Sequence, residues 1–163
     1  MKLIRRLLLV FLFTSLCMTT IGLADFSSAA ETGESILVTD MDSLKQAAAD
    51  GKRQIILDAD IALQNGVDEI CFFVPTVIDG QGKYTLSNTQ SNETLNHFVS
   101  SDDLTLKDIP DIKLEGGIGG IYSTEDLTIE NCKLHVNNGQ DYGINAMKRI
   151  ELKGSTLDLS NNS

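Results

Sequence analysis

The chain has 163 residues, of which 13 are basic and 23 acidic, so its formal net charge at pH 7 is −10. A surface with this excess of negative charge repels nucleic acids and polyanionic sugars unless a cation bridges them, so nucleic acid is not expected among the partners. Aromatic residues make up 6% of the chain and tryptophan is absent, so a broad aromatic platform for stacking sugars is not expected either.

The first 30 residues are typical of a secretory signal peptide. A basic start that ends at Arg6 precedes a long apolar run, and small residues then allow cleavage after Ala30 or, alternatively, after Ala24. A retained membrane anchor is the competing interpretation, because the apolar run is almost long enough to span a bilayer. Cleavage after Ala30 would leave 10 basic and 22 acidic residues from the chain's 13 and 23, a net charge of −12. We expect a secreted or cell-surface protein that touches a membrane only if the signal segment is kept.

Residues 31–53 are expected to cap the N-terminal end of the fold that follows. Asp42 or Ser43 is suited to begin a short helix as its N-cap, and Gly51 is suited to end it. The expected helix has one narrow apolar face, formed by Leu44, Ala47 and Ala48. Such a helix can cover the core and the strand edges that the first turn of a repeat protein would otherwise expose.

A repeat occupies the rest of the chain. Segments starting at Leu104, Leu127 and Ile150 read LTLKDIPDIKLEG, LTIENCKLHVNNG and IELKGSTLDLSNN, and their starts are 23 residues apart. Each segment holds two apolar–x–apolar pairs separated by a short break, and this alternation predicts short strands with one buried face. The break contains Asp108, Asn131 or Gly154. These residue types tolerate a left-handed backbone, so the break predicts a sharp corner.

A third apolar position precedes each segment by six residues and is occupied by Phe98, Ile121 and Ile144. Looser copies begin at Ile55 and Thr76, so five rungs are visible at intervals of 21, 28, 23 and 23 residues. Three short strands per period fit a right-handed parallel β-helix better than a leucine-rich repeat, which has one strand per turn.

We therefore predict an all-β fold, a right-handed parallel β-helix of about five rungs over residues 54–163, behind a short capping helix. The last rung stops at LSNNS without a second cap. We expect either that the natural chain continues past Ser163 or that another molecule covers this open end, for example by self-association.

Four stretches carry a family resemblance. SLKQAAADGKRQIILDADIAL is similar to the N-terminal cap and first rung of the pectate-lyase-like superfamily, and TVIDGQGKYTL to its I-D-G-x-G-x-T-L rung. EDLTIENCKLHV and YGINAMKRIELKGSTLDL are similar to its later rungs. Within that superfamily of right-handed β-helices, the chain most closely resembles the adhesive and repeat domains of bacterial surface proteins. The resemblance covers about residues 40–163 and implies the fold. It implies no single activity, because the superfamily holds lyases, hydrolases, adhesins and cell-wall proteins.

The resemblance also implies one metal hypothesis, since polysaccharide lyases of this fold hold Ca²⁺ with acidic residues. Asp58 and Asp60 are expected to point outward from one strand, and the repeat places Asp79 in the register of Asp58, about 5 Å away on the next rung. These three carboxylates form the candidate Ca²⁺ site. The same column continues with Lys107, Glu130 and Lys153. Because that column alternates in sign, the alternative is a solvent-facing ladder of ion pairs.

The remaining acidic motifs are interpreted as structural. Polygalacturonases of this fold carry paired aspartates together with GHG and RIK motifs, and here Asp102–Asp103 supply a pair while GHG is absent and RIK is incomplete. We therefore interpret Asp102–Asp103 and Glu125–Asp126 as polar corners before a strand. No catalytic residue is assigned to this chain.

Cys71 and Cys132 are expected on different rungs, on the order of 10 Å apart at about 4.8 Å per rung, which is too far for a disulfide. We interpret both as buried small hydrophobic residues. His97 and His135 have no companion at metal-ligand spacing. The sequence NET at Asn92 is a formal glycosylation sequon.

These observations favour an exported, non-enzymatic surface module that acts as an adhesive or carbohydrate-contacting stalk. A rigid side that presents one residue per rung suits a long ligand, such as an extracellular polysaccharide or a host or cell-surface glycan. The alternative is the N-terminal part of a polysaccharide lyase or glycoside hydrolase whose catalytic rungs lie beyond residue 163. Apart from Ca²⁺ at the three aspartates, no cofactor is expected. A third class, a purely structural assembly protein, predicts self-association without glycan binding.

Overall fold

The computed structural model describes residues 34–63, 69–88, 96–137 and 139–160. The expected signal peptide and the sequon at Asn92 lie outside these ranges. Within them the chain forms a parallel β-solenoid of about five turns with one short helix. No helix in this part of the chain is long and apolar enough to cross a membrane.

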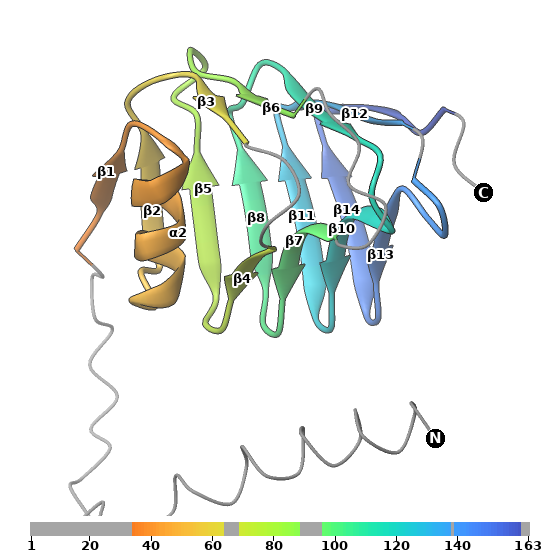
Figure 1. Ribbon diagram of the computed structural model, residues 1–163, viewed down its shortest axis with the longest axis horizontal. Coiled ribbons are helices and arrows are strands. Elements are labelled where there is room, and N and C mark those ends of the chain that lie inside the picture. Colours follow the sequence, from red (N-terminus) through yellow and green to blue (C-terminus); the bar gives the residue numbers. More distant parts are fainter. Residues whose placement is uncertain (1–33, 64–68, 89–95, 138, 161–163) are drawn as a thin grey trace, which may run out of the picture. The chain divides into compact units, whose positions relative to one another are not determined.

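Three parallel sheets form the walls of the solenoid, and successive turns add strands side by side (Figure 1). Sheet A runs in the order β1 (Ile36–Val38), β2 (Gln54–Leu57), β5 (Thr76–Asp79), β8 (Leu104–Lys107), β11 (Asp126–Glu130) and β14 (Arg149–Lys153). Sheet B runs β3 (Ile61–Ala62), β6 (Leu86–Ser87), β9 (Ile112–Glu115), β12 (Lys133–Asn137) and β15 (Thr156–Asp158). Sheet C runs β4 (Ile70–Phe72), β7 (Asn96–Ser100), β10 (Gly119–Ser123) and β13 (Ile144–Ala146).

Inward side chains stack on their equivalents one turn away and build one continuous apolar core. In sheet A, Leu127 pairs in register with Leu104 on one side and with Ile150 on the other. Leu104 and Leu127 are fully buried, so the predicted interior file is confirmed, and each such side chain contributes about 1.5–3 kcal/mol to stability. The same stacking joins, in the other two sheets, Phe98 to Ile121 and Ile112 to Leu134.

The last described turn exposes its apolar side chains. Ile150 is 40% exposed and Leu152 is 46% exposed, whereas Leu127 and Ile129, which occupy the same files one turn earlier, are fully buried. Strand β14 is an edge strand of sheet A, so its inward side chains are covered from one side only. The exposure follows from the missing neighbour and not from a change in the direction of these side chains.

A residue with a left-handed backbone turns the chain between sheets A and B. Asp108, Asn131 and Gly154 have φ angles of 49°, 51° and 58°, which confirms the corner predicted at these positions. The Nδ2 atom of Asn131 donates to Oδ1 of Asp108 at 2.9 Å, so the corners are linked from turn to turn. In the second turn the left-handed residue is Gln81, whereas the preceding Gly80 is needed for space: a Cβ there would lie 2.7 Å from the Asp108 carbonyl oxygen.

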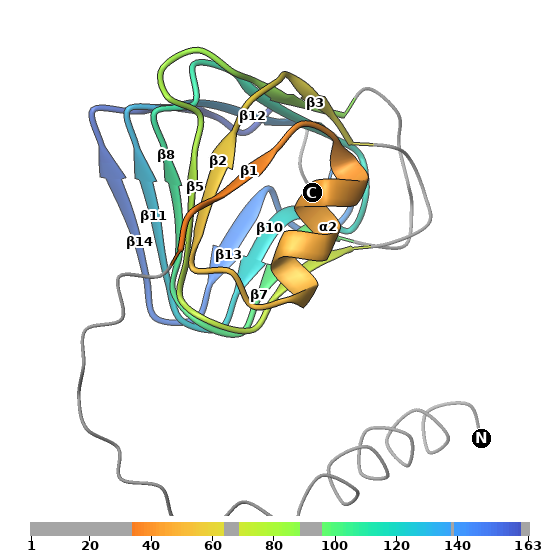
Figure 2. The same cartoon turned by 90° about the vertical axis from the view of Figure 1, so that its left-hand side faces the viewer.

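Helix α2 (Met41–Ala49) lies across the N-terminal end of the solenoid (Figure 2). Its buried residues are those predicted, Leu44, Ala47 and Ala48. The N-cap is Asp40, so the prediction of Asp42 or Ser43 was wrong. Oδ1 of Asp40 accepts from the Ser43 N–H at 2.8 Å, and Oγ of Ser43 accepts from the Asp40 N–H at 3.1 Å. This capping box satisfies two backbone donors at once, which selects Asp40 over its neighbours.

The spacing of the first two rungs differs from the prediction. Ile55 pairs with Ile78, so these strands are 23 residues apart and not 21. A shift of two residues leaves every side chain on its own face, so the alternation of apolar residues cannot distinguish the two registers. In addition, β1 extends sheet A before the first predicted rung, within residues that the sequence assigned to the cap. The right-handed sense of winding stays a prediction, because strand order and register are the same for either hand.

The corner at Asn131 provides a test of the backbone argument. We expect Asn131→Ala to be less stable than Asn131→Gly by about 1 kcal/mol, because alanine bears the steric cost of the left-handed conformation and glycine does not. Both variants lose the hydrogen bond to Asp108 equally, so their difference isolates the backbone. Urea unfolding followed by circular dichroism measures it, and equal midpoints for the two variants would contradict the assignment.

Candidate functional site

A row of polar and aromatic side chains crosses several turns along sheet C. In the register of this sheet, Gly119 lies beside Asn96, and Tyr142 falls next to Gly119 on the following turn. Because Gly119 has no side chain, the ring of Tyr142 lies over it: a Cβ at this position would be 2.2 Å from the ring. The small residue in the middle turn thus allows a tyrosine to reach back across it.

Hydrogen bonds connect this tyrosine to earlier turns. The hydroxyl of Tyr142 donates to Oδ1 of Asn96 at 2.5 Å, although the two residues are 46 positions apart. The backbone N–H and the Nδ2 atom of Asn96 both donate to Oε1 of Glu69, at 2.9 and 3.1 Å. Tyr142, Asn96 and Glu69 therefore form one network that holds the tyrosine in place.

A second tyrosine extends the row toward the last turn. The ring centroids of Tyr122 and Tyr142 are 6.4 Å apart and the rings are inclined by 45°, a favourable arrangement for an aromatic pair. The hydroxyl of Tyr122 contacts the sulfur of Met147 at 3.3 Å. We call this row the tyrosine strip and define it as Glu69, Asn96, Tyr122, Tyr142 and Met147. Both tyrosines are partly exposed, so each offers aromatic surface to a ligand.

The strip leads at its N-terminal end into a shallow pocket between α2 and β4. The pocket has a volume of about 300 Å³ and is lined by Lys45, Ala49, Glu69, Ile70, Cys71 and Phe73. Phe73 is 65% exposed, and Glu69 belongs to both the pocket and the tyrosine strip. A ligand lying along sheet C would therefore meet an apolar recess at one end and a tyrosine pair at the other.

The protonation of the strip follows from its burial. Partial burial raises the pKa of Tyr142, which keeps its hydroxyl a hydrogen-bond donor at neutral pH. Burial also lowers the pKa of the neighbouring His97, an effect that the backbone carbonyls of Glu115 and Gly116 partly offset. His97 is thus held neutral, and its Nδ1 atom lies 3.0 Å from the amide nitrogen of Asn88.

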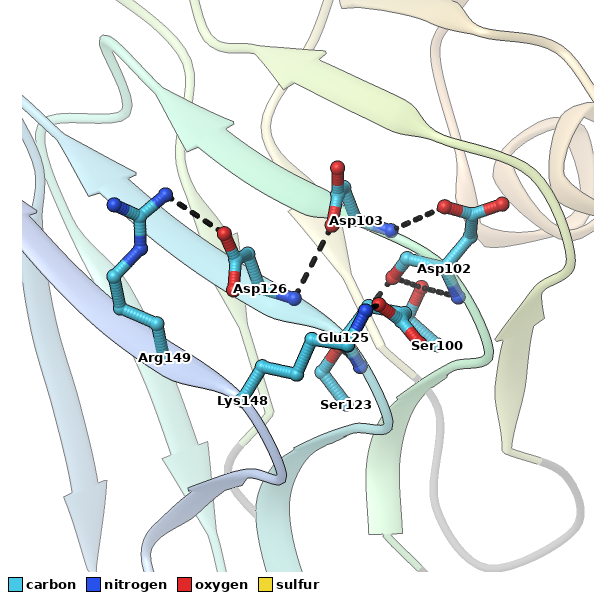
Figure 3. Close-up of polar contacts among 8 residues, drawn as sticks. All are labelled: Ser100, Asp102, Asp103, Ser123, Glu125, Asp126, Lys148 and Arg149. Atoms are coloured by element: carbon cyan, nitrogen blue, oxygen red, sulfur yellow. Dashed lines mark hydrogen bonds and ion pairs between the residues drawn. The ribbon is translucent and has the colours of Figure 1, made fainter.

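The paired acidic residues lie at the corner between sheets C and A (Figure 3). Oδ1 of Asp103 accepts from the backbone N–H of Asp126 on the next turn at 3.2 Å, and Oδ1 of Asp102 accepts from the Asp103 N–H at 2.9 Å. The last turn contributes two cations that pair with carboxylates of the turn before it. Arg149 lies 2.7 Å from Asp126, and Lys148 forms an ion pair with Glu125. All four carboxylates are engaged in local or turn-to-turn contacts, as expected of residues that hold a corner together.

The outer face of sheet A carries columns of charge. Asp79, Lys107, Glu130 and Lys153 pair in register on successive turns. Nζ of Lys107 lies 3.3 Å from Oδ2 of Asp79, so these two opposite charges of the column form an ion pair. Exposed pairs of this kind contribute little individually, at most about 1 kcal/mol.

The register behind the calcium hypothesis was wrong. Asp79 pairs with Ile56 and not with Asp58, since β2 and β5 are offset by two residues from the predicted alignment. Oδ1 of Asp60 instead accepts from the backbone N–H of Thr85 at 2.9 Å, which binds it to the corner before sheet B. Among the residues in the described ranges, no group of three or more His, Cys, Asp or Glu could hold a metal ion.

Cys71, Cys132 and His135 do not belong to the tyrosine strip. Cys132 is 4% exposed and free, and burial raises its pKa, so it behaves as a small hydrophobic residue. Cys71 is also free but only partly buried, so its prediction as a buried residue was wrong. The two ring nitrogens of His135 face different carboxylates, Asp158 at 3.3 Å and Asp111 at 3.7 Å. His135 thus lies between carboxylates of the turns before and after its own in sheet B.

No family model, curated protein or solved structure matches this chain. The candidate site therefore depends on its own geometry. The sequence did not predict the tyrosine strip, although a signal for it was present: the register position two residues before the third apolar station is occupied by Asn96, Gly119 and Tyr142.

The packing of Tyr142 over Gly119 can be tested by a double-mutant cycle. We expect Gly119→Ala to lower the free energy of unfolding by about 1–3 kcal/mol, because the added methyl group overlaps the ring and displaces it from Asn96. In a Tyr142→Ala background the same change should cost less, by about 1 kcal/mol or more. Chemical unfolding measures both values, and near-ultraviolet dichroism, which tyrosine dominates in the absence of tryptophan, reports displacement of the ring. Additive costs would contradict the contact.

His97 predicts a dependence of stability on pH. Since the folded state lowers its pKa below the ordinary 6.5, the unfolded chain binds the proton more readily, and stability falls as the pH drops below about 6.5. Carboxylates also lose stability in acid, so the informative quantity is the difference between proteins. We expect His97→Gln to reduce the loss between about pH 7.5 and about pH 5.5, and His135→Gln to keep the component due to His97. An unchanged pH profile in His97→Gln would refute the assignment.

Proposed function

We propose that this chain is an exported, non-enzymatic surface module that binds a glycan along sheet C. The signal-peptide pattern of residues 1–30 supports export. The resemblance to pectate-lyase-like domains of bacterial surface proteins supports an adhesive or carbohydrate-contacting role, and a parallel β-solenoid is the architecture that this resemblance implies. The proposed partner is an extracellular polysaccharide or a host or cell-surface glycan.

The observation that carries the proposal is the pairing of Tyr122 with Tyr142 beside Asn96 and Glu69. Tyrosine offers an apolar ring face and a polar hydroxyl, which suits ligands that have both apolar C–H surfaces and hydroxyl groups. An amide and a carboxylate held within the same row supply fixed hydrogen-bonding groups. A small number of placed polar groups next to aromatic surface is the usual composition of a specific binding site.

Geometry and charge narrow the class of ligand. The contacts of the strip join positions from Glu69 to Met147, so the surface follows the solenoid axis and suits an extended chain. The acidic character of the protein disfavours polyanionic glycans. We therefore favour a neutral or cationic polysaccharide, such as one built from hexoses or amino sugars, and the proposal requires no cofactor.

The tyrosine pair provides the test. We expect the purified protein to bind neutral or amino-sugar polymers on a glycan array and in calorimetric titration, and Tyr122→Ala to weaken this binding by about tenfold, which corresponds to about 1.4 kcal/mol. Tyr84→Ala is the matched control, because Tyr84 lies between β5 and β6 and its hydroxyl contacts Lys83, outside the strip. It should bind like the wild type.

Three outcomes would count against the proposal. Preferential binding of polyuronates would contradict the electrostatic argument, and equal losses in Tyr122→Ala and Tyr84→Ala would remove the strip from the binding surface. Absence of any glycan signal, together with concentration-dependent self-association, would favour a purely structural assembly role.

A further inference from the structure

An uncharged column joins the pocket beside helix α2 to the tyrosine pair. On the outer face of sheet C, Cys71 pairs in register with Val99, and Val99 with Tyr122. All three side chains are partly exposed. Burial, followed by the charge of Glu69, raises the pKa of Cys71, so its thiol is neutral at neutral pH. Two strand spacings separate Cys71 from Tyr122, about 10 Å, so a polymer on the tyrosine pair also reaches the pocket.

The lining of the pocket suits a small group that is apolar and has no net charge. It combines the side chain of Ile70, which is only 2% exposed, with the largely exposed ring of Phe73 and the methyl group of Ala49. Lys45 and Glu69 contribute charges of opposite sign, so the lining as a whole has no net charge. An apolar ligand group gains stability from covering Ile70 and Phe73, whereas a charged group loses hydration there.

One oxygen of Glu69 is available to a ligand in this pocket. Oε1 accepts two hydrogen bonds from Asn96, one from its backbone N–H and one from Nδ2. Between residues of the described ranges, no hydrogen bond engages Oε2. A carboxylate has room for about four hydrogen bonds, so the anchored side chain retains acceptor capacity beside the apolar lining. A group that fills the pocket well therefore carries an N–H donor next to an apolar part.

We propose that this pocket binds the N-acetyl group of an amino sugar, and that the glycan on sheet C is a polymer of N-acetylated amino sugars. This inference rests on the proposed function and specifies its ligand. An acetamido group has one N–H donor, one methyl group and no net charge. Its N–H donates to Oε2 of Glu69, and its methyl group packs against Ile70 and Phe73. Sugar rings of the same polymer lie on Tyr122 and Tyr142.

Three oligosaccharides of equal length separate the alternatives. The hexamers of chitin, chitosan and cellulose share one linkage and differ only in one substituent of each ring, which is an acetamido group, a free amino group or a hydroxyl group. The amino and hydroxyl groups have no methyl group to fill the pocket. We therefore expect the chitin hexamer to bind the purified protein at least about tenfold more tightly than either of the others in calorimetric titration.

Changes in the pocket should remove this preference. Ala49→Leu places a larger side chain in the pocket, and Phe73→Ala removes part of its apolar lining. Each should reduce the ratio of the chitin and cellulose affinities from about tenfold to about twofold or less. Glu69→Gln replaces the acceptor Oε2 with a donor or displaces Asn96, and should lower the ratio by about fivefold. Ala62→Leu is the matched control, because Ala62 is exposed on sheet B, and it should leave the ratio unchanged.

The outcomes separate this inference from the proposed function. Equal affinities for the three hexamers, falling together in Tyr122→Ala, would overturn the pocket assignment and keep the tyrosine strip as a glycan site. Tighter binding of the chitosan hexamer would also overturn it and assign Glu69 to a cation. A ratio unchanged in both Ala49→Leu and Phe73→Ala would place acetyl recognition outside the pocket. If no hexamer binds, the inference fails, and the glycan array alone decides on the proposed function.

Discussion

The structure depends on one constraint: each turn must place its inward side chains on the equivalent side chains of the turn before it. This requirement restricts the register between neighbouring strands, because a shift by one residue would turn every apolar side chain of a strand toward water. The file of Leu104, Leu127 and Ile150 is the result in sheet A. The corner residues obey the same requirement, since Asp108 and Asn131 share a left-handed backbone and a hydrogen bond between their side chains.

The same stacking orders the outer surface. A column of outward residues lies one strand spacing apart on successive turns, so charges far apart in the sequence become neighbours. On the outer face of sheet A, Lys107 contacts Asp79 across 28 positions. The same turn-to-turn register brings Tyr142 to Asn96 across 46 positions, at the edge of sheet C and two residues before its core stations. The tyrosine strip and the charged columns are therefore two products of one repeat. The ligand proposed for sheet C would use this regularity across the turns.

The repeat pattern specifies which face of a strand a side chain occupies and where the chain turns, but it does not fix the register between turns. Apolar alternation identified the interior files, because they have a local cause in the side-chain period. The corners at Asn131 and Gly154 were identified because these residue types tolerate a left-handed backbone. The register assumed for the candidate calcium site was wrong, because Asp79 pairs with Ile56 and not with Asp58, two residues from the predicted alignment. A shift of two residues keeps every side chain on its own face of the strand, so the alternation of apolar residues does not reveal it. The N-cap was missed by two residues because several adjacent residues were suitable caps.

By itself, the sequence determined the solenoid, its short strands, its corners and the helix that covers one end, since these depend on hydrophobic period and on local backbone preference. Only the tertiary structure decided which side chains meet across turns. Gly119 allows the ring of Tyr142 to reach Asn96. The repeat places these three residues at one register position, but it does not show that the ring crosses the glycine. The physical reason is that contacts between turns depend on register and on the space left by an intervening residue. Both are properties of the assembled stack.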